Sequence, residues 1–210
     1  MDQFRRNPVL WLIVLGAILV YSVLEGGLLG EKKDEQGMGG PSTLVAGVDI
    51  GGPFELVDQT GKTVTNADFA GKMMLVYFGF TYCPDICPAE LLIMGQAVDL
   101  LGDKAADVVP IFITVDPKRD PPDKMKDYVA AFHPRLVGLT GNEAQVSAAA
   151  KAYRVFYRYV PEKEGGELGD DYRVDHTGYI YLMDRSGLYV AHFVHGQSAE
   201  IIAAGIKKHL

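Results

Sequence analysis

The sequence predicts an α/β sandwich with a mixed central sheet, preceded by one N-terminal transmembrane helix. Three observations carry this prediction. Short apolar runs alternate with segments of helical periodicity along most of the chain, a pattern typical of helices that cover a sheet. The last two apolar runs form a hairpin, so the sheet contains antiparallel as well as parallel neighbours. A separate uncharged apolar stretch lies near the N-terminus.

Composition limits the classes of protein to which the chain can belong. Apolar residues make up 48% of its 210 residues, and the mean hydropathy of +0.07 is slightly high for a globular protein with 22% charged residues. The formal net charge of −7 argues against a nucleic-acid partner, because such a partner requires a basic face. Two cysteines cannot form the disulfide framework of a small secreted protein. We therefore expect one folded domain and no nucleic-acid partner.

The apolar stretch near the N-terminus is expected to anchor the protein in a membrane. Residues 8–24 carry no charge. This stretch of 17 residues is at the short end of the lengths that span a bilayer. Trp11 and Tyr21 lie near its ends, where aromatic rings favour the membrane interface. A cleaved signal peptide is the alternative, but no small-x-small cleavage site follows. We place the transmembrane anchor at residues 8–28.

The charges that flank the anchor indicate its orientation. Arg5 and Arg6 precede it and Lys32 and Lys33 follow it, so the count of basic residues is tied. The arginines lie closer to the bilayer and share their end with the α-amino group, so we expect residues 1–7 to lie in the cytoplasm. No Arg- and Ser-rich transit segment precedes the anchor. The expected location is therefore a bacterial inner membrane, with the C-terminal domain in the periplasm.

A short tether is expected between the anchor and the folded domain. Residues 29–43 are charged and then rich in glycine, a composition typical of a flexible linker. The domain is expected at residues 44–210, which is long enough to bury a self-sufficient hydrophobic core.

The expected strands begin with a hairpin around the turn sequence at residues 58–62. Two continuous apolar runs, 73–80 and 108–115, are typical of central strands that are covered on both faces. Shorter strands are expected at residues 154–160, 179–183 and 188–194.

Helical periodicity, supported by capping and stop residues, predicts four helices. We expect these helices at residues 89–101, 121–132, 142–153 and 199–209. An acidic, glycine-rich loop is expected at residues 162–171.

The most specific feature of the chain is a pair of cysteines where a central strand turns into a helix. Open α/β sheets place their sites at the C-terminal ends of such strands. Cys83 and Cys87 are four residues apart, so a helical turn puts both thiols on one face. A helix N-terminus favours thiolate over thiol, and thiolates bind soft metals and attack disulfides. The alternative is a structural disulfide, but so small a loop restrains the unfolded chain by only about 2 kcal/mol.

Residues 80–88 read Phe-Thr-Tyr-Cys-Pro-Asp-Ile-Cys-Pro, and further segments of similar character follow. These segments are residues 114–120, 128–141, 172–177 and 180–184. Together they resemble the Sco/SenC family of membrane-anchored proteins used in assembling cytochrome c oxidase, whose copper-site motif matches residues 80–88. The resemblance covers residues 45–210 and implies a thioredoxin-like three-layer sandwich with a mixed central sheet.

The resemblance also implies a copper site. One copper ion, as Cu(I) or Cu(II), would be held by the sulfurs of Cys83 and Cys87 and the imidazole of His176. Two thiolates select soft Cu(I), and an added imidazole also accommodates Cu(II). Three ligands leave an open coordination position, which allows copper to be handed on by ligand exchange. The implied partners are the copper-bearing subunit of cytochrome c oxidase and other periplasmic copper carriers.

The surroundings of His176 distinguish it from the other histidines. It follows the acidic loop, precedes an apolar strand, and lies in a His-Thr-Gly sequence where thioredoxin-like oxidoreductases commonly carry a cis-proline. Asp85 and Asp116 are candidates for carboxylates that support the site by orienting an imidazole. A helix-start carboxylate and a turn residue are the simpler interpretations of these two. The other histidines are expected to have ordinary roles: His133, His192 and His195 as cap or strand residues and His209 in solvent.

Two functions from different classes fit these residues. The first is a non-enzymatic metallochaperone that delivers copper to the oxidase copper centre. The alternative is a thiol–disulfide oxidoreductase, either as the main function or as an accessory activity, that reduces oxidase-subunit cysteines before copper insertion. It needs the same cysteines but not His176, and three residues separate them where thioredoxin-type enzymes have two. A peroxiredoxin-like peroxidase is a weaker third option, because its Pro-x-x-x-Thr-x-x-Cys pattern is absent around either cysteine.

The expected compartment adds a redox partner. The periplasm is oxidising, so Cys83 and Cys87 are expected to form a redox-active disulfide there. Thiols must be reduced before they bind a metal. We therefore expect a thioredoxin-like reductant among the partners.

Overall fold

A seven-stranded sheet forms the centre of the structure, a computed structural model that describes residues 49–163 and 166–210. From one edge to the other, its strands are β2 (Thr63–Thr65), β1 (Glu55–Asp58), β5 (Val137–Thr140), β4 (Val108–Thr114), β3 (Met73–Gly79), β8 (Ile180–Met183) and β9 (Tyr189–Phe193). The central strands β3, β4 and β5 are parallel, and the pairings toward both edges are antiparallel. The mixed sheet expected from the sequence is therefore confirmed.

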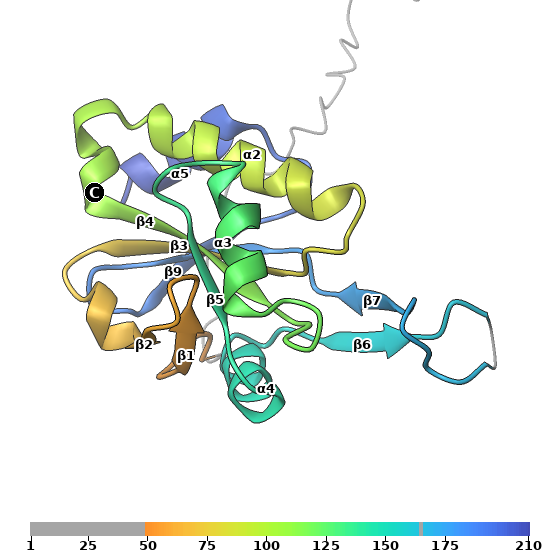
Figure 1. Ribbon diagram of the computed structural model, residues 1–210. Coiled ribbons are helices and arrows are strands. Elements are labelled where there is room, and N and C mark those ends of the chain that lie inside the picture. Colours follow the sequence, from red (N-terminus) through yellow and green to blue (C-terminus); the bar gives the residue numbers. More distant parts are fainter. Residues whose placement is uncertain (1–48, 164–165) are drawn as a thin grey trace, which may run out of the picture. The chain divides into compact units, whose positions relative to one another are not determined.

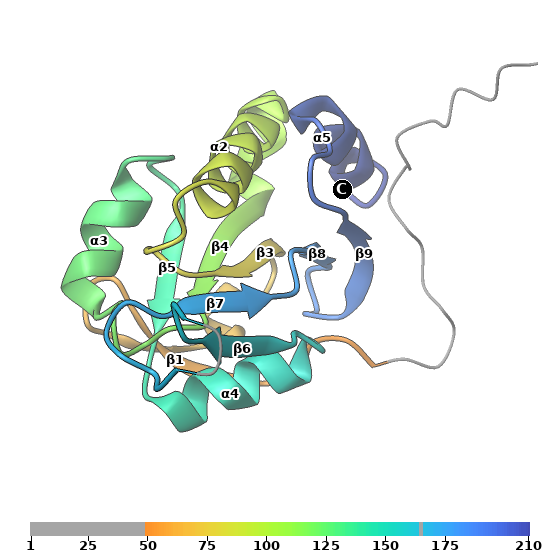
Figure 2. The same ribbon diagram turned by 90° about the vertical axis from the view of Figure 1, so that its right-hand side faces the viewer.

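Helices cover both faces of this sheet. They are α2 (Ile86–Asp99), α3 (Pro122–Ala130), α4 (Glu143–Ala152) and α5 (Ala199–Lys207), with two 3-10 helices, η1 (Asn66–Phe69) and η2 (Gly102–Asp107). Figures 1 and 2 show α2, α3 and α5 on one side of the sheet and α4 on the other. Every residue of β3 is buried, as expected for a continuous apolar strand with both faces covered.

The two strands β6 (Tyr157–Val160) and β7 (Arg173–His176) form a second, antiparallel sheet. Figure 1 shows this pair to one side of the main sheet, away from β1 and β2. Its register places Tyr157 opposite His176. His176 is therefore the last residue of a paired strand, where the sequence suggested a position directly after a loop. Strand pairing restricts the backbone of this residue.

Two strands give little signal in the sequence, and neither was predicted. β5 is four residues long and contains Gly138, where an added Cβ would lie 2.9 Å from Val129 of α3. The glycine lowers the strand propensity of the segment, but it lets α3 pack closely against the sheet. β7 is also four residues long and is mostly polar. Segments this short are hard to distinguish from loops by periodicity.

Some boundaries also differ from those expected. The helix expected at residues 89–101 begins at Ile86, so Cys87 lies in its first turn. The strand expected at residues 154–160 begins only at Tyr157. Arg154 adopts a left-handed φ of 58° directly after α4, and this conformation separates the helix from the strand.

The expected transmembrane anchor and linker, residues 8–28 and 29–43, lie outside the described residues. Among the residues that the structure describes, no helix is both long enough and apolar enough to cross a membrane.

Candidate metal centre

The two cysteines lie where β3 passes into α2, at the C-terminal end of a central strand. Cys83 is in the connecting turn and is half-buried, whereas Cys87 is in the first turn of α2 and is fully buried. Both are free thiols. The Tyr77 hydroxyl lies 3.8 Å from the Cys87 sulfur and donates a hydrogen bond to it. A Cβ at Gly79 would come within 2.8 Å of the same sulfur, so glycine is needed at the end of the strand.

The environment gives the two thiols opposite acid–base properties. The Cys87 thiol donates a hydrogen bond to Cys83, and the backbone N–H groups of Cys87, Asp85 and Ile86 point at the same sulfur. These donors lower the pKa of Cys83 to about 5, although burial acts in the opposite direction. Donation to Cys83, burial and the neighbouring negative charge raise the pKa of Cys87. The pair therefore holds one thiolate and one thiol at neutral pH.

His176 presents a lone pair to the sulfur of Cys87. Its Nδ1 lies 3.0 Å from the carbonyl oxygen of Thr177. A carbonyl oxygen only accepts, so Nδ1 carries the ring proton and Nε2 is left with its lone pair. Nε2 lies 3.7 Å from the sulfur of Cys87. The rings of Tyr77 and Phe80 meet the imidazole edge-on, at centroid distances of 6.2 and 5.9 Å, and support its orientation.

Two sulfurs and one imidazole nitrogen are a donor set suited to a soft metal ion. With metal–ligand distances of about 2.0–2.3 Å, as for zinc, two ligands of one ion lie about 3.6–3.8 Å apart. The separation between Cys87 and His176 falls in this range. Within residues 49–163 and 166–210, no three His, Cys, Asp or Glu side chains are already arranged as the ligands of one ion. Cys87 thus contacts both Cys83 and His176, but the three side chains are not preformed as a metal site in this part of the chain.

A groove of about 450 Å³ leads from the surface to these donors. Cys83 and His176 both line it, together with Ile86, Asp175 and His195. The thiolate of the pair is therefore the sulfur that a ligand or partner reaches first, while Cys87 lies buried behind it.

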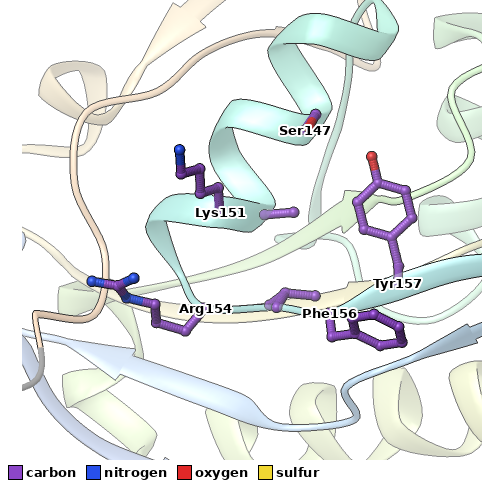
Figure 3. A pocket seen from close by; sticks show the side chains of 7 residues that line it. Ser147, Lys151, Arg154, Phe156 and Tyr157 are labelled. Atoms are coloured by element: carbon purple, nitrogen blue, oxygen red, sulfur yellow. The ribbon is translucent and has the colours of Figure 1, made fainter.

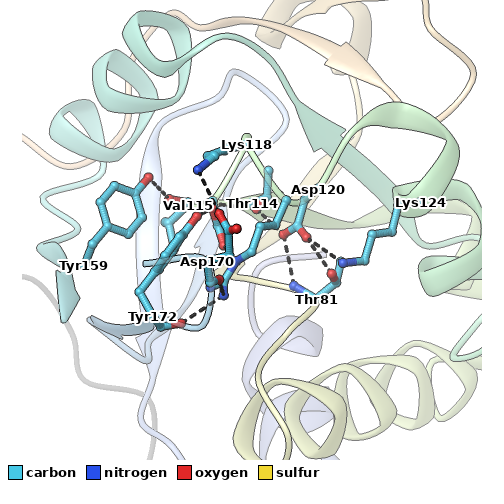
Figure 4. Close-up of polar contacts among 11 residues, drawn as sticks. Thr81, Thr114, Val115, Lys118, Asp120, Lys124, Tyr159, Asp170 and Tyr172 are labelled. Carbon is cyan, nitrogen blue, oxygen red and sulfur yellow. Dashed lines mark hydrogen bonds and ion pairs between the residues drawn. The ribbon is translucent and has the colours of Figure 1, made fainter. Parts of the chain in front are cut away.

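The buried carboxylate of Asp120 holds the turn that carries Cys83. It accepts hydrogen bonds from the Thr81 backbone N–H at 3.0 Å and the Thr81 hydroxyl at 2.5 Å. The Thr114 hydroxyl at the end of β4 donates to the same carboxylate at 2.6 Å, and Lys124 lies 3.8 Å away (Figure 4). Because a buried carboxylate needs such partners, this network joins the cysteine turn rigidly to the neighbouring strand.

Asp116, a candidate for support of the site, performs a similar joining role. It is fully buried, accepts a hydrogen bond from the Tyr172 hydroxyl at 2.6 Å, and pairs with Arg119. The Arg119 guanidinium stacks 3.7 Å from the centre of the Tyr172 ring. These contacts tie the end of β4 to the residue that leads into β7, which carries His176. The Asp85 carboxylate is exposed, and neither aspartate side chain bonds to the thiols or the imidazole within the described residues.

Three of the remaining histidines do not line the groove. His133 pairs through Nε2 with Asp99 at 3.2 Å. His192 in β9 lies 2.5 Å from the Tyr189 hydroxyl. His209 is exposed near the C-terminus.

His195 differs from the strand residue that was expected. It lies beyond the end of β9, lines the groove, and its Nδ1 is 2.5 Å from the buried carboxylate of Glu90. Neither residue was a candidate in the sequence. Glu90 follows Cys87 by three residues and so lies one helical turn beyond it on α2, which is the signal that could have found it.

A second hollow, of about 380 Å³, lies between the end of α4 and β6 (Figure 3). Lys151, Arg154, Phe156 and Tyr157 line it, and none of its lining residues is a cysteine, histidine or carboxylate. This hollow therefore offers no donor set for a soft metal.

Comparison with known proteins identifies the family. The family model described as SCO1/SenC matches residues 43–210. The chain belongs to the SCO1/SenC family. The matched range contains both cysteines and His176, so the resemblance noted in the sequence is confirmed.

Two related proteins agree with the assignment of the chain to the SCO1/SenC family. A SCO2-like protein from Rickettsia felis is 39% identical over 200 residues, covering 92% of this chain and 96% of the relative. A crystal structure described as Arabidopsis thaliana ScoI with copper bound is 40% identical, with a TM-score of 0.70, and covers 76% of this chain and 97% of that one. The thioredoxin domain of a thiol-disulfide oxidoreductase from Bacteroides vulgatus is 18% identical, covers 76% of this chain and 94% of that one, and has a TM-score of 0.52. This likeness confirms that the SCO1/SenC chain has a thioredoxin-like fold.

Proposed function

We propose that this SCO1/SenC protein is a copper metallochaperone for cytochrome c oxidase. It binds one copper ion through the sulfurs of Cys83 and Cys87 and through Nε2 of His176, and delivers it to the oxidase copper centre during assembly. The observation that carries this proposal is the 3.7 Å approach of the unprotonated Nε2 to the Cys87 sulfur. The related Arabidopsis thaliana protein, solved with copper bound, supports copper as the metal.

The arrangement suits transfer better than storage. The Cys83 thiolate is available to copper at neutral pH because its pKa is lowered to about 5. Copper binding displaces the proton from Cys87 and leaves a three-coordinate ion. An open position on such an ion, facing the groove, lets a ligand of the acceptor bind before the chaperone's ligands leave. No electron needs to move in this exchange.

The remaining parts of the chain fit this role. Residues 8–28 anchor the protein in a bacterial inner membrane, with residues 1–7 in the cytoplasm. Residues 29–43 form a linker, and residues 44–210 form the copper-binding domain in the periplasm. Its partners are the copper-bearing oxidase subunit, periplasmic copper carriers and a thioredoxin-like reductant that keeps the cysteine pair reduced.

An anaerobic titration of the reduced full chain with Cu(I), against a chromophoric competing chelator, tests the proposal. We expect one tightly bound copper per chain, and a loss of affinity of at least about tenfold in His176→Ala. His209→Ala is the matched control, because this exposed histidine lies outside the groove. Equal affinity of the wild type, Cys83→Ser and His176→Ala would overturn the chaperone function.

The asymmetry of the two thiols favours a second candidate, a thiol–disulfide oxidoreductase. The Cys83 thiolate would attack a disulfide of the oxidase subunit, form a mixed disulfide and release one thiolate. Cys87 would then lose its proton and attack Cys83, which releases the second thiolate and leaves a Cys83–Cys87 disulfide. The target gains two electrons and this protein loses two, so an external reductant must restore the pair.

Disulfide reduction by His176→Ala separates the two functions. A variant that reduces an oxidised oxidase-subunit peptide at the wild-type rate, but no longer binds copper tightly, shows that reduction does not need the imidazole and that copper binding does. The imidazole would then serve the chaperone activity alone. A peptide-reduction rate of zero in the wild type would remove the oxidoreductase function.

A further inference from the structure

A buried carboxylate lies one helical turn beyond Cys87. Glu90 is 1% exposed, and a carboxyl group buried in this way needs hydrogen-bond partners. One oxygen, Oε1, accepts hydrogen bonds from His195 Nδ1 at 2.5 Å and from the Gly196 backbone N–H at 3.1 Å. The other oxygen, Oε2, is buried and has no hydrogen-bond partner within the described residues. The hydrogen-bonding capacity of the Glu90 carboxyl group is therefore only partly satisfied within this part of the chain.

His195 connects this carboxylate to the groove. Its side chain is 53% exposed and lines the same groove as Cys83 and His176. Because Oε1 already accepts a hydrogen bond from the Gly196 backbone N–H, it is an acceptor, and Nδ1 of His195 is the donor that carries a proton. Nε2 is then available to a ligand from the groove. The tautomer is the same as that of His176, although a carboxylate takes the place of a backbone carbonyl.

We propose that His195, held by Glu90, is a second imidazole ligand for copper in this groove. This inference rests on the proposed chaperone function. His195 binds the ion through Nε2 when His176 is withdrawn, during loading or release of copper. One Cu–N bond forms as another breaks, no electron or proton is transferred, and the charge on copper is unchanged.

The chemistry of the Glu90 and His195 pair supports this role. Metal-bound histidines commonly donate their other ring N–H to a carboxylate, which fixes the ring and makes the ligating nitrogen more basic. A cation at Nε2 would also polarise the imidazole and strengthen its hydrogen bond to the Glu90 carboxyl group. A second donor near the open side of the site keeps copper bound while His176 exchanges.

A purely structural clamp is the competing explanation. Glu90 joins α2 to the loop before α5 through its bond to the Gly196 backbone N–H. A clamp would affect stability and leave copper affinity unchanged, so the two explanations predict different results for the same variants.

The test is an anaerobic Cu(I) competition titration of the reduced full chain in the His176→Ala background. We expect His176→Ala/His195→Ala to bind copper about tenfold more weakly than His176→Ala. His176→Ala/His192→Ala is the control, because His192 does not line the groove. A double variant with the affinity of His176→Ala overturns the inference, and a loss that also occurs in the control does the same.

Glu90→Gln tests the orienting role without opening a cavity. Glutamine can still accept the hydrogen bonds but lacks the charge, so in the His176→Ala background we expect a loss smaller than that of His195→Ala. Thermal unfolding of each variant checks that the fold is retained. An unchanged copper affinity in Glu90→Gln removes Glu90 from the inference.

Failure of the inference and failure of the proposed function give different results. If the wild type binds copper no more tightly than Cys83→Ser, the chaperone function fails and His195 loses its role with it. If the wild type binds tightly through its cysteines and His195→Ala has no effect in the His176→Ala background, only the role of His195 fails.

Discussion

At the scale of single residues, the position of one proton determines what each side chain of the site can do. The Thr177 carbonyl fixes the proton of His176 on Nδ1 and leaves Nε2 facing the sulfur of Cys87. Backbone and thiol donors stabilise the thiolate of Cys83, while burial and that same thiolate keep Cys87 protonated. The Cys83 sulfur is thus reactive and lines the groove, and the Cys87 sulfur is protonated and buried behind it.

Alkylation of Cys83 should therefore depend on pH in an unusual range. Only the thiolate reacts, and the pKa of Cys83 is lowered to about 5. We expect the rate with iodoacetamide, corrected for buffer, to rise between about pH 4 and 6 and to be level above that, whereas an ordinary cysteine titrates near pH 8.5. Mass spectrometry of the modified peptide identifies the site. A rate that keeps rising to pH 9 would contradict the low pKa.

Replacement of Cys87 provides a matched pair of variants for the same measurement. Cys87→Ser keeps a hydroxyl that can donate to Cys83, so the midpoint should stay low. Cys87→Ala removes the donor, so the midpoint should move to higher pH. Equal midpoints in the two variants would show that the backbone N–H groups alone stabilise the thiolate.

At the scale of elements, the site is assembled by packing between segments that are distant in sequence. β3 ends beside Cys87, and β7 carries His176. The hydrogen bonds of Asp120 fix the turn before Cys87, and those of Asp116 fix the segment before β7. Gly79 shows how closely these parts fit, because a Cβ there would lie 2.8 Å from the Cys87 sulfur and 2.9 Å from the Phe112 ring.

Gly79→Ala should disturb both stability and metal binding. The added methyl group has no space, so α2 must shift away from β3 or the Cys87 side chain must rotate. We expect a loss of about 1–3 kcal/mol in the free energy of unfolding, measured with urea, and weaker binding of copper. Gly169→Ala is the control, because a Cβ there meets nothing within 4 Å. Wild-type stability in Gly79→Ala would contradict the close contact.

The sequence pattern of each element explains which elements could be predicted. Residues 73–80 and 108–115 were recognisable as central strands because continuous apolar runs require both faces to be covered. β5 and β7 were missed because four residues, interrupted by glycine or mostly polar, carry almost no periodic signal. The cysteine pair could be found from its spacing.

The rest of the site depends on tertiary packing. The bond between Glu90 and His195 joins residues that are 105 positions apart, and no local pattern indicates it. Asp116 could be named as a turn residue, but its partner Tyr172 lies in the segment before β7. Asp120 was not singled out, because its partner Thr81 lies in the cysteine turn, 39 positions away in the sequence. His176 needed the family resemblance, because its strand has no signal of its own.

At the scale of the whole molecule, the proposed function requires the domain to work beside a membrane protein. The proposed anchor at residues 8–28 would keep the chaperone near its acceptor and so raise the effective concentration of each for the other. The proposed linker at residues 29–43 would set how far the copper site can move from the membrane.

Membrane anchoring can be tested in cells. We expect the full chain to remain in the membrane pellet after extraction with alkaline carbonate, because a spanning helix is held by apolar burial and not by charge. A version that begins at residue 44 behind a cleavable export signal should appear in the soluble periplasmic fraction. Protease added to spheroplasts should digest the full-length domain. Release of the full chain by carbonate would contradict the anchor.

The most direct test of the copper site is a ¹⁵N NMR spectrum of the histidine side chains in the reduced protein, before and after one equivalent of Cu(I). If His176 ligates copper with the two cysteines, its Nε2 resonance shifts strongly, its Nδ1 stays protonated, and the shift disappears in Cys83→Ser. An unchanged His176 resonance in a protein that has bound one copper ion would contradict the proposed ligation by His176.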